Sequence, residues 1–360
     1  MFDLRTYTFQ GIPRMMAATC AVLSLHCSWG QTPVERLRLE NIRLRAQVDS
    51  LQRQVRALRD AAAIDLWEGL TGIERDDAFE EYSDGFGLGG LKVSPEMTER
   101  LRRCVPCITL PYTETLGKYL DFYSGTKRSS MASVLGRYDR YASLFAETFR
   151  RYGVPEELAG LSIVESAVSP RALSKAGAYG AWQLMPETAR QYGLRVDDYV
   201  DERADMKKAT EAAARYLSGA YNSLGSWGLA VLSYNCGVGA VRKAIVKAGG
   251  SKDLWKVMEF LPDETQGYLP SLFAARNVLV NRDEFGIKAR PYKVPRTESV
   301  TVSMQTTLGD IARKAGLDEK LLLDLNPKYA GGRVPAGENE ILLPEGYAQR
   351  LRRAAEGKDD

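Results

Sequence analysis

The chain shows three successive patterns of apolar and polar residues. Residues 34–62 place mainly valine at one core position of each heptad and leucine at the other, with one polar exception, Asn41. This pattern favours a parallel two-stranded coiled coil. We therefore predict a coiled-coil helix over residues 34–66 that forms a homodimer through residues 34–62. The alternative is a long amphipathic helix that packs on its own domain.

The middle of the chain has the pattern of a helical domain. Residues 67–93 are first acidic and then rich in glycine, as in the run GFGLGG, which predicts a linker. From residue 94 to residue 290, apolar side chains recur at helical spacing in a series of short segments, and alternating β-branched runs are few. The sequence therefore predicts an all-α domain over residues 94–290.

The pattern changes again over residues 297–346. VTVSM and EILLP have the composition of strands. Between them lie two helical segments, TTLGDIARKAG with Thr306 or Thr307 as its cap and LDEKLLLDLNP with Asp318 as its cap. We predict a small βααβ module here. The charged residues 347–360 are predicted to form a frayed tail.

The first 30 residues have the features of an export signal. Arg5 and Arg14 precede the apolar run MMAATCAVLSL, and small residues precede Gln31. We predict that residues 1–30 are a signal peptide and that the mature chain lies in the periplasm or cell envelope. The alternative is an uncleaved membrane anchor, although the run is shorter than the roughly 20 residues that span a bilayer.

Composition and charge narrow the class of function. The chain has 360 residues, of which 44% are hydrophobic and 26% charged, as in soluble globular proteins. Removing residues 1–30 takes away two arginines and one aspartate, which changes the net charge from +3 to +2. A chain so close to neutrality has no basic surplus, so we predict no nucleic-acid partner.

Histidine and cysteine narrow the chemistry further. His26 is the single histidine of the chain and lies inside the predicted signal. The mature chain then lacks histidine, which excludes Ser-His-Asp and Cys-His nucleophile systems and metal sites with histidine ligands. Cys104 and Cys107 have a lone C-x-x-C spacing, which fits either a disulfide or two free thiols.

The stretch LSIVESAVSP places an acid, Glu165, among aliphatic residues. Pro155 predicts the start of a helix that ends near Ser166. On this helix Leu158, Leu161 and Glu165 share one face, so the carboxyl points toward the core. Two interpretations follow. The carboxyl caps a helix or pairs with an arginine, or the apolar surroundings raise its pKa so that it acts as a general acid near neutral pH.

Three later motifs combine polar side chains with glycine at predicted helix ends. They are GAYGAWQLMPETA at residues 177–189, LSYNCGVG at residues 232–239 and ETQGYLP at residues 264–270. Such helix ends are consistent with a cleft in which a chain of hydroxyl and amide groups lies against exposed backbone. Each motif alone is common, so their order along the chain carries the information.

Together with Glu165-Ser166, these motifs resemble the catalytic domain of the family 1 lytic transglycosylases, and the likeness is closest to the membrane-bound D type. These goose-lysozyme-like enzymes cleave bacterial cell-wall glycan. The resemblance extends over about residues 95–285. It implies a mainly α chain with a lysozyme-like all-α catalytic domain. It also implies peptidoglycan glycan strands as the partner and a reaction that needs no metal or organic cofactor.

The resemblance also implies roles for single residues. Glu165 is the implied general acid and base. The implied glycan-binding residues are Ser166, Tyr179, Gln183, Met185, Tyr234, Asn235, Glu264 and Tyr268. Trp182, Ser233 and Cys236 are among the departures from the family pattern. None removes a group that the chemistry needs, and Trp182 is expected to reshape a subsite.

The C-terminal unit resembles a LysM module, a small peptidoglycan-binding fold. The likeness rests on the Asn326-Pro327 pair, the closing run at residues 342–344 and the spacing of the apolar framework. The framework residues are Leu308, Ile311, Ala312, Leu322 and Leu325. Because this pattern consists mostly of core positions, it predicts the fold of the module more strongly than it predicts glycan binding.

Three functions remain open at this point. The resemblance implies cleavage by a single acid, Glu165, in which a sugar hydroxyl replaces water and leaves a 1,6-anhydro end. A hydrolase on the same fold would need a second acid such as Asp201, Glu202 or Glu264, although the first two fit better as caps or ion-pair partners at a helix start. The third possibility is a non-catalytic scaffold, dimerised through residues 34–62 and gripping glycan through the LysM-like unit.

Overall fold

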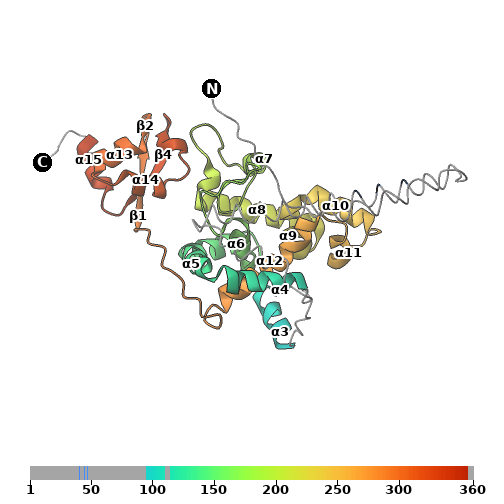
Figure 1. Ribbon diagram of the computed structural model, residues 1–360. Helices are drawn as coiled ribbons and strands as arrows, with labels where there is room; N and C mark the ends of the chain where they lie inside the picture. The colour runs from blue at the N-terminus through green and yellow to red at the C-terminus, as the bar shows by residue number, and fades with distance from the viewer. Residues whose placement is uncertain (1–39, 41–43, 45–46, 48–94, 110–113, 356–360) are drawn as a thin grey trace, which may run out of the picture. The chain divides into compact units, whose positions relative to one another are not determined.

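The computed structural model describes residues 40, 44, 47, 95–109 and 114–355 (Figure 1). By its contacts the chain divides into two units, Met1–Ala63 and Ile64–Asp360. The predicted signal peptide, linker and nearly all of the predicted coiled coil lie outside the described residues, so these remain predictions. The elements that follow all belong to Ile64–Asp360.

The helical domain is built from short and medium helices that end at capping residues. Asp205 caps one helix by accepting hydrogen bonds from Lys207 N and Lys208 N, and Asp253 caps another by accepting from Lys256 N. The elements are α3 Pro95–Cys104, α4 Glu114–Asp121, the π-helix η1 Phe122–Thr126, α5 Arg128–Arg151, the 3₁₀ helix η2 Glu156–Gly160, α6 Leu161–Ser166, α7 Pro186–Gln191, the 3₁₀ helix η3 Glu202–Ala204, α8 Met206–Leu224, α9 Trp227–Cys236, α10 Val238–Lys247, α11 Leu254–Met258 and α12 Asp263–Val280.

Helix α12 is the centre of this domain. Figure 1 shows it among α4, α6 and α9, and it packs on each of them as well as on α3. Its residues from Tyr268 to Ala275 are buried without interruption, because neighbouring helices cover it on several sides. The short helix α6, which carries Glu165, packs directly on α12. The fold therefore brings Glu165 and Tyr268 together although they are far apart in sequence.

A sharp corner separates α9 from α10. Ser226 caps the start of α9, and Gly237 at its end has φ 83° and ψ 148°, a backbone conformation that favours glycine. The corner leaves Tyr234 and Asn235 on the last turn of α9. Among the described residues no single helix is long and apolar enough to cross a membrane, whereas α9 and α10 taken together, with a bend of 118°, pass that test of length and composition.

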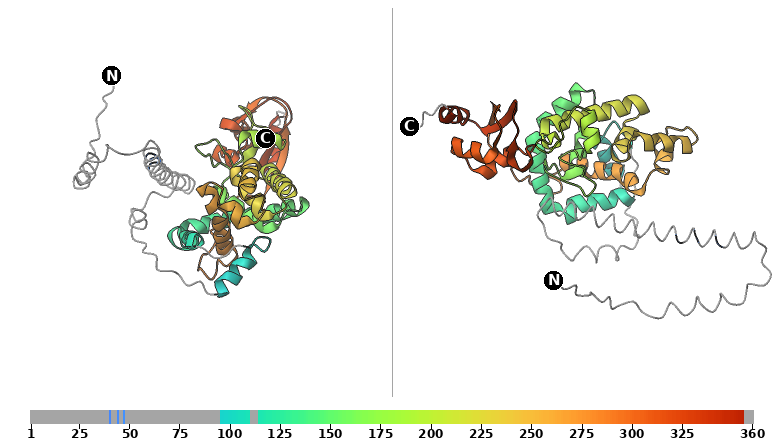
Figure 2. Two further views of the ribbon diagram at one scale, coloured as in Figure 1. Left: turned by 90° about the vertical axis from the view of Figure 1, so that its right-hand side faces the viewer. Right: turned by 90° about the horizontal axis from the view of Figure 1, so that it is seen from above.

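The C-terminal module has the predicted strand and helix order with additions. Its elements are β1 Thr297–Val302, β2 Thr306–Thr307, α13 Leu308–Ala315, α14 Glu319–Leu325, the 3₁₀ helix η4 Ala330–Gly332, β3 Arg333–Val334, β4 Asn339–Pro344 and α15 Ala348–Ala355, drawn in orange and red in Figures 1 and 2. β1 and β4 are antiparallel, with Thr297 opposite Pro344, and β2 pairs with β3. Thr307 and Asp318 cap α13 and α14. The side chain of Asn326 bonds the backbone of β4 at Leu342.

The prediction of a frayed tail is wrong for residues 348–355, which form helix α15. Ala348 is buried and Leu351 packs against the core of the module. The backbone N–H of Ala348 also donates to the Glu298 carboxylate at 2.8 Å. Alanine and arginine favour a helix, and two apolar residues three positions apart give it a face that binds the module. The many charged residues around these two apolar positions led to the prediction of a frayed tail.

Candidate active site

Glu165 lies on the last turn of α6, where it is partly exposed. Its Oε1 accepts a hydrogen bond from the Tyr268 hydroxyl of α12. Burial raises the pKa of Glu165 from 4.5 to about 7; the Tyr268 hydrogen bond opposes this rise, and the charge of Glu264 adds to it. The partner of this carboxyl is thus a neutral phenol rather than an arginine. At neutral pH a substantial fraction of Glu165 therefore carries a proton.

Three tyrosines surround this acid. Tyr268 is 6% exposed, the Tyr234 hydroxyl donates to Trp182 O at 2.8 Å, and the Tyr123 and Ser271 hydroxyls are 2.9 Å apart. Burial raises the pKa of each phenol, and the charge of Glu165 raises it further. All three therefore stay neutral at neutral pH. Sequence analysis missed Tyr123, because it comes from η1, which belongs to none of the motifs.

The chain turns abruptly after Ser166. Ala167 has φ 53° and Val168 has φ 60°, in the left-handed region. This conformation is uncommon for alanine and an outlier for a β-branched residue such as valine. The Arg137 side chain bonds the Ala167 carbonyl at 2.9 Å and so holds the turn. Backbone strain of this kind clusters at functional sites, and here it directly follows the acid.

Ser166 has a structural role. It is 1% exposed, and its hydroxyl donates to the Ala181 carbonyl at 2.9 Å and accepts from Ser169 N. A glycan contact of the Ser166 side chain stays a prediction. Its hydroxyl ties α6 to the loop of residues 177–185.

The loop of residues 177–185 forms a small antiparallel turn. Tyr179 and Leu184 exchange both backbone hydrogen bonds, at 3.1 and 3.2 Å. At the tip of the turn Gln183 has φ 45°, and its Nε2 donates to the Ala172 and Gly180 carbonyls, each at 2.9 Å. These bonds hold the amide group rigidly beside α6, because both acceptors are backbone atoms.

The two remaining predicted residues of this loop lie at its surface. Met185 is 39% exposed and precedes Pro186, the first residue of α7. Tyr179 is half-buried, and the Arg203 guanidinium lies over its ring at 5.3 Å. Both side chains therefore remain candidates for contact with a ligand.

Trp182 is a core residue, which corrects the expectation that it reshapes a subsite. It is fully buried, and its ring packs on Phe145 and Phe149 with centroid distances of 5.3 and 5.4 Å. Its indole N–H donates to the Thr210 hydroxyl at 2.9 Å. Trp182 therefore anchors the loop to α5 and α8.

The last turn of α9 and the first turn of α12 face each other. Asn235 is exposed, and its Oδ1 accepts a hydrogen bond from the Thr265 hydroxyl at 2.7 Å. Glu264 is exposed beside it and is close enough to Glu165 to raise the pKa of that carboxyl. The structure thus brings Glu165, Glu264 and Tyr268 into one region. Thr265, which orients Asn235, lies inside the motif at residues 264–270, but the sequence does not show that its hydroxyl reaches the end of α9.

Two of the three carboxylates considered for a hydrolase, Asp201 and Glu202, pair with basic side chains, whereas the third, Glu264, is exposed near Glu165. Asp201 pairs with Arg203 at 2.7 Å and caps η3. Glu202 is buried, accepts from Arg195 N at 2.8 Å and pairs with Lys208. The structure therefore gives both acids the capping and pairing roles that suit a helix start.

The C-x-x-C pair lies inside the described residues. Cys104 and Cys107 are free thiols. Burial raises the pKa of both. Within the ranges that the structure describes, no group of three or more histidine, cysteine, aspartate or glutamate side chains could hold a metal ion.

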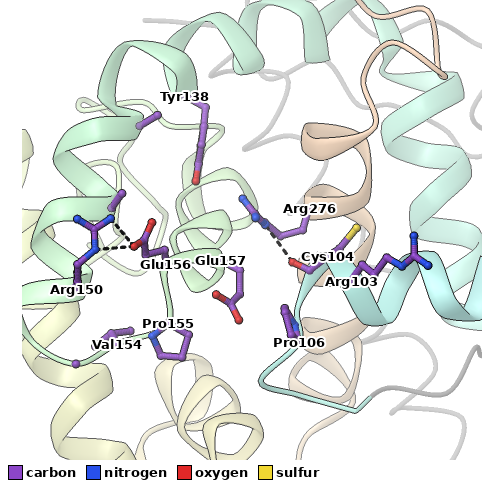
Figure 3. A pocket seen from close by; sticks show the side chains of 13 residues that line it. Arg103, Cys104, Pro106, Tyr138, Arg150, Val154, Pro155, Glu156, Glu157 and Arg276 are labelled. Atoms are coloured by element: carbon purple, nitrogen blue, oxygen red, sulfur yellow. Dashed lines mark hydrogen bonds and ion pairs between the residues drawn. The ribbon is translucent and has the colours of Figure 1, made fainter.

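A separate hollow of about 740 Å³ lies between α3, α5 and α12. In Figure 3, Arg276, Glu157 and the Arg150–Glu156 ion pair line it. None of the predicted site residues lines this hollow. The candidate site is therefore placed at Glu165, where an acid of raised pKa lies near residues of the predicted motifs.

Two family models match the chain. Residues 143–256 match the transglycosylase SLT domain, and residues 296–358 match the LysM-like domain of lytic transglycosylase MltD. Within this chain, residues 143–256 are thus similar to the transglycosylase SLT domain of lytic transglycosylases. Its SLT domain followed by this LysM-like domain is the arrangement of the MltD type. The second match also extends over α15, in agreement with its packing on the module.

Curated relatives point the same way. The chain is 33% identical over 231 residues to membrane-bound lytic murein transglycosylase D of Escherichia coli K12, which is 62% of this chain and 51% of the relative. It is 26% identical over 147 residues to the soluble lytic murein transglycosylase of the same organism, which is 38% of this chain and 23% of the relative. The chain thus spans about half the length of the first relative.

Solved structures give a weaker likeness. The lytic transglycosylase Slt of Pseudomonas aeruginosa, solved as an inactive mutant, has a TM-score of 0.33 at 19% identity and covers 63% of this chain and 44% of its own. The 70 kDa soluble lytic transglycosylase of Escherichia coli has a TM-score of 0.34 at 20% identity, with 65% and 45% covered. The predicted fold class, a mainly α chain with a lysozyme-like catalytic domain and a small C-terminal module, is confirmed.

Proposed function

We propose that this chain is a peptidoglycan lytic transglycosylase with Glu165 as its single general acid and base. The observation that carries the proposal is the Glu165 carboxyl, held by the Tyr268 hydroxyl with a pKa raised to about 7, inside the residues that match the SLT domain. A carboxyl with this pKa can both donate and accept a proton near neutral pH. The two relatives, both murein transglycosylases by name, agree with this substrate class.

The reaction needs one acid and no water. Protonated Glu165 donates its proton to the oxygen that joins C1 of N-acetylmuramic acid to N-acetylglucosamine, and the C1–O bond breaks. The muramyl C6 hydroxyl then attacks C1, and its proton returns to the Glu165 carboxylate. One glycosidic bond is broken and one internal C6–O–C1 bond is formed, so Glu165 ends in its starting state. The products are a 1,6-anhydro end and a free N-acetylglucosamine 4-hydroxyl.

The neighbouring side chains suit a glycan ligand. Gln183 and Asn235 present amide groups held by backbone and threonine partners, which match the acetamido groups of the two sugars. The Tyr234 hydroxyl bonds the carbonyl of Trp182, the residue before Gln183, and Tyr179 and Met185 supply half-exposed apolar surface. We assign these residues and Glu264 to glycan binding. Tyr268 orients the acid.

Localisation and assembly follow from this assignment. A glycan substrate in the cell wall requires action in the periplasm or cell envelope, and the first relative is described as membrane-bound. We propose that the C-terminal module contributes glycan binding. A homodimer through residues 34–62 also remains a proposal, since these residues lie almost wholly outside the described ranges.

The mass of the products tests the reaction. Purified peptidoglycan sacculi digested with residues 31–360 are expected to release muropeptides lighter by one water than those of a muramidase, as measured by liquid chromatography and mass spectrometry. A muramidase digest of the same sacculi is the reference. Hydrated reducing ends in place of anhydro ends would overturn the single-acid mechanism in favour of a hydrolase. Binding without any release would favour the scaffold.

Tyr268→Phe is expected to move the pH dependence of cleavage. The Tyr268 hydrogen bond lowers the pKa of Glu165, so its removal raises that pKa. The wild-type rate is expected to fall above pH 7 as the acid deprotonates. In the variant this fall should begin at a higher pH, with the plateau rate lower by roughly tenfold because the acid loses its orientation. Initial rates from pH 4 to 9 measure both effects.

Tyr216→Phe is the matched control. The Tyr216 hydroxyl is also part-buried in the same domain but donates to the Ser233 carbonyl, at 2.6 Å. Its loss should leave the fall in rate at the wild-type pH. An unchanged profile in Tyr268→Phe would mean that this tyrosine does not set the protonation of Glu165.

A further inference from the structure

The C-terminal module contacts the catalytic domain at Arg171, which pairs with Asp324 at 3.0 Å, and at a short hairpin, residues 196–201. Val196 and Asp201 form a β-bridge at its base. At its tip Val200 forms a second bridge with Tyr329 of the module. Asp201 N donates to Lys328 O at 2.8 Å, and Ala330 N donates to Tyr199 O at 2.9 Å. The hairpin and the module thus share main-chain hydrogen bonds of the kind that join strands.

Side chains reinforce this contact. Val200 is 3% exposed and belongs to the apolar core of the module. Arg333 donates to the Asp198 carbonyl at 2.8 Å, and its guanidinium lies 5.0 Å from the centre of the Tyr199 ring. Lys328 is 8% exposed and pairs with Asp205, the cap of α8, at 3.3 Å.

The same hairpin is linked to the loop of residues 177–185 through Asp201 and Arg203. The Asp201 carboxylate binds the Arg203 guanidinium through both oxygens, at 2.9 and 2.7 Å. Arg203, which is 7% exposed, uses its Nη1 to bond the carbonyls at both ends of the loop, Gly177 O at 2.7 Å and Leu184 O at 3.0 Å.

The backbone of Arg203 is equally close to the loop. A side chain at Gly180 would lie 2.0 Å from the Arg203 carbonyl oxygen, so the loop and Arg203 approach each other at van der Waals contact. A displacement of Arg203 therefore cannot leave the loop unchanged. The contact chain runs from Lys328 through Asp201 and Arg203 to the turn that carries Gln183.

We propose that Arg203 is a positioning residue for the glycan site and that the docked C-terminal module holds it in place. The docked module then affects the turnover rate of the catalytic domain, in addition to binding glycan. This inference rests on the proposed function for its catalytic consequence. The coupling of the module to the loop rests on the contacts alone. If the module is undocked, Asp201 loses its backbone partner, Arg203 gains freedom, and the Gln183 amide loses its alignment with Glu165.

A double variant tests the coupling in the full chain. Lys328→Met with Arg333→Ala removes the ion pair of Lys328 with Asp205 and the contacts of the Arg333 guanidinium with the hairpin, and it leaves every residue of the catalytic domain in place. Arg313→Ala with Lys314→Met is the matched control, since it removes the same two charges from exposed residues of the same module. Equal net charge in the two variants cancels any general attraction to the cell wall. Circular dichroism and a thermal melt establish that both variants fold.

Two measurements are compared. Hydrogen exchange followed by mass spectrometry reports peptides that cover residues 177–185, with peptides of α5 as the internal reference. Turnover of a soluble tetrasaccharide of alternating N-acetylglucosamine and N-acetylmuramic acid reports catalysis. In the Lys328→Met/Arg333→Ala variant we expect faster exchange of the loop, unchanged exchange of α5, and a kcat lower by roughly tenfold. The control variant should match the wild type in all three.

The outcomes separate the two claims. Loop exchange equal to that of the wild type in the undocking variant overturns the coupling, whatever the activity. Faster loop exchange with unchanged kcat overturns the role of Arg203 in positioning the glycan site. If the wild type turns over neither the tetrasaccharide nor sacculi, the proposed function fails, while the exchange data still decide the coupling. A loss confined to sacculus binding would identify the module as a glycan anchor only.

Discussion

Glu165→Gln is expected to lower the rate of glycan cleavage by roughly 10²- to 10⁴-fold, the usual contribution of a positioned general acid. Glutamine has nearly the same shape and accepts the Tyr268 hydrogen bond, but it cannot give a proton to the glycosidic oxygen. Because the same carboxyl must also receive the proton of the muramyl C6 hydroxyl, both halves of the reaction are lost together. Release of muropeptides from sacculi, followed by mass spectrometry, measures the effect.

Glu157→Gln provides a matched control for this result. Glu157 lies on η2, directly before α6, and lines the hollow of Figure 3 rather than the glycan site. Its substitution removes one carboxylate from the same segment and should leave the rate near that of the wild type. Glu165→Gln with more than a tenth of wild-type activity would show that another group supplies the proton.

The same substitution has a predicted effect on stability. The pKa of Glu165 rises from 4.5 to about 7 on folding, so the folded state favours the protonated carboxyl. Its contribution to stability is fully present below pH 4.5 and is lost as the pH rises through 7. The loss is on the order of 3 kcal/mol, from a shift of about 2.5 pKa units. Glutamine does not titrate, so its free energy of unfolding lacks this loss. The difference between Glu165→Gln and the wild type should therefore grow in favour of the variant from pH 4.5 to about 7 and stay constant at higher pH.

Trp182→Ala is expected to lower the free energy of unfolding by about 3–5 kcal/mol, the cost of removing a large buried aromatic side chain. Trp182 is fully buried between Phe145 and Phe149. Its loss leaves a cavity beneath the loop of residues 177–185 and removes the partner of the Thr210 hydroxyl. Urea unfolding of the full chain, followed by circular dichroism, measures the change. Trp182→Phe should cost less, because the ring remains while the N–H is lost.

Trp227→Ala tests whether the loss of stability in Trp182→Ala comes from the burial of Trp182 rather than from the removal of any tryptophan. Trp227 is only half-buried and stacks on Tyr221 with ring centroids 4.1 Å apart. We expect its substitution to cost clearly less than that of Trp182. If Trp182 instead lined a subsite, Trp182→Ala would unfold at the wild-type urea concentration and would raise KM for the glycan.

Local patterns in the sequence determined the elements and the central acid of this protein. The caps Thr307 and Asp318 were predictable because a capping side chain bonds backbone atoms only two or three residues away. Glu165 could be found because an acid stands out among aliphatic residues, although the single helix predicted from Pro155 is divided into the 3₁₀ helix η2 and the helix α6. The order of the motifs then led to Gln183, Asn235 and Tyr268. All of these signals depend on neighbours along the chain.

Only the tertiary structure decided which side chains meet. Tyr123 reaches the surroundings of Glu165 from a π-helix, and Arg203 reaches the Gln183 loop from a 3₁₀ turn that the C-terminal module contacts. Trp182 sits beside Gln183 in sequence yet points into the core. Burial, the pKa of a carboxyl and the clamp on a loop all arise from contacts between residues distant in sequence, and hydrophobic spacing along a single segment does not encode those contacts.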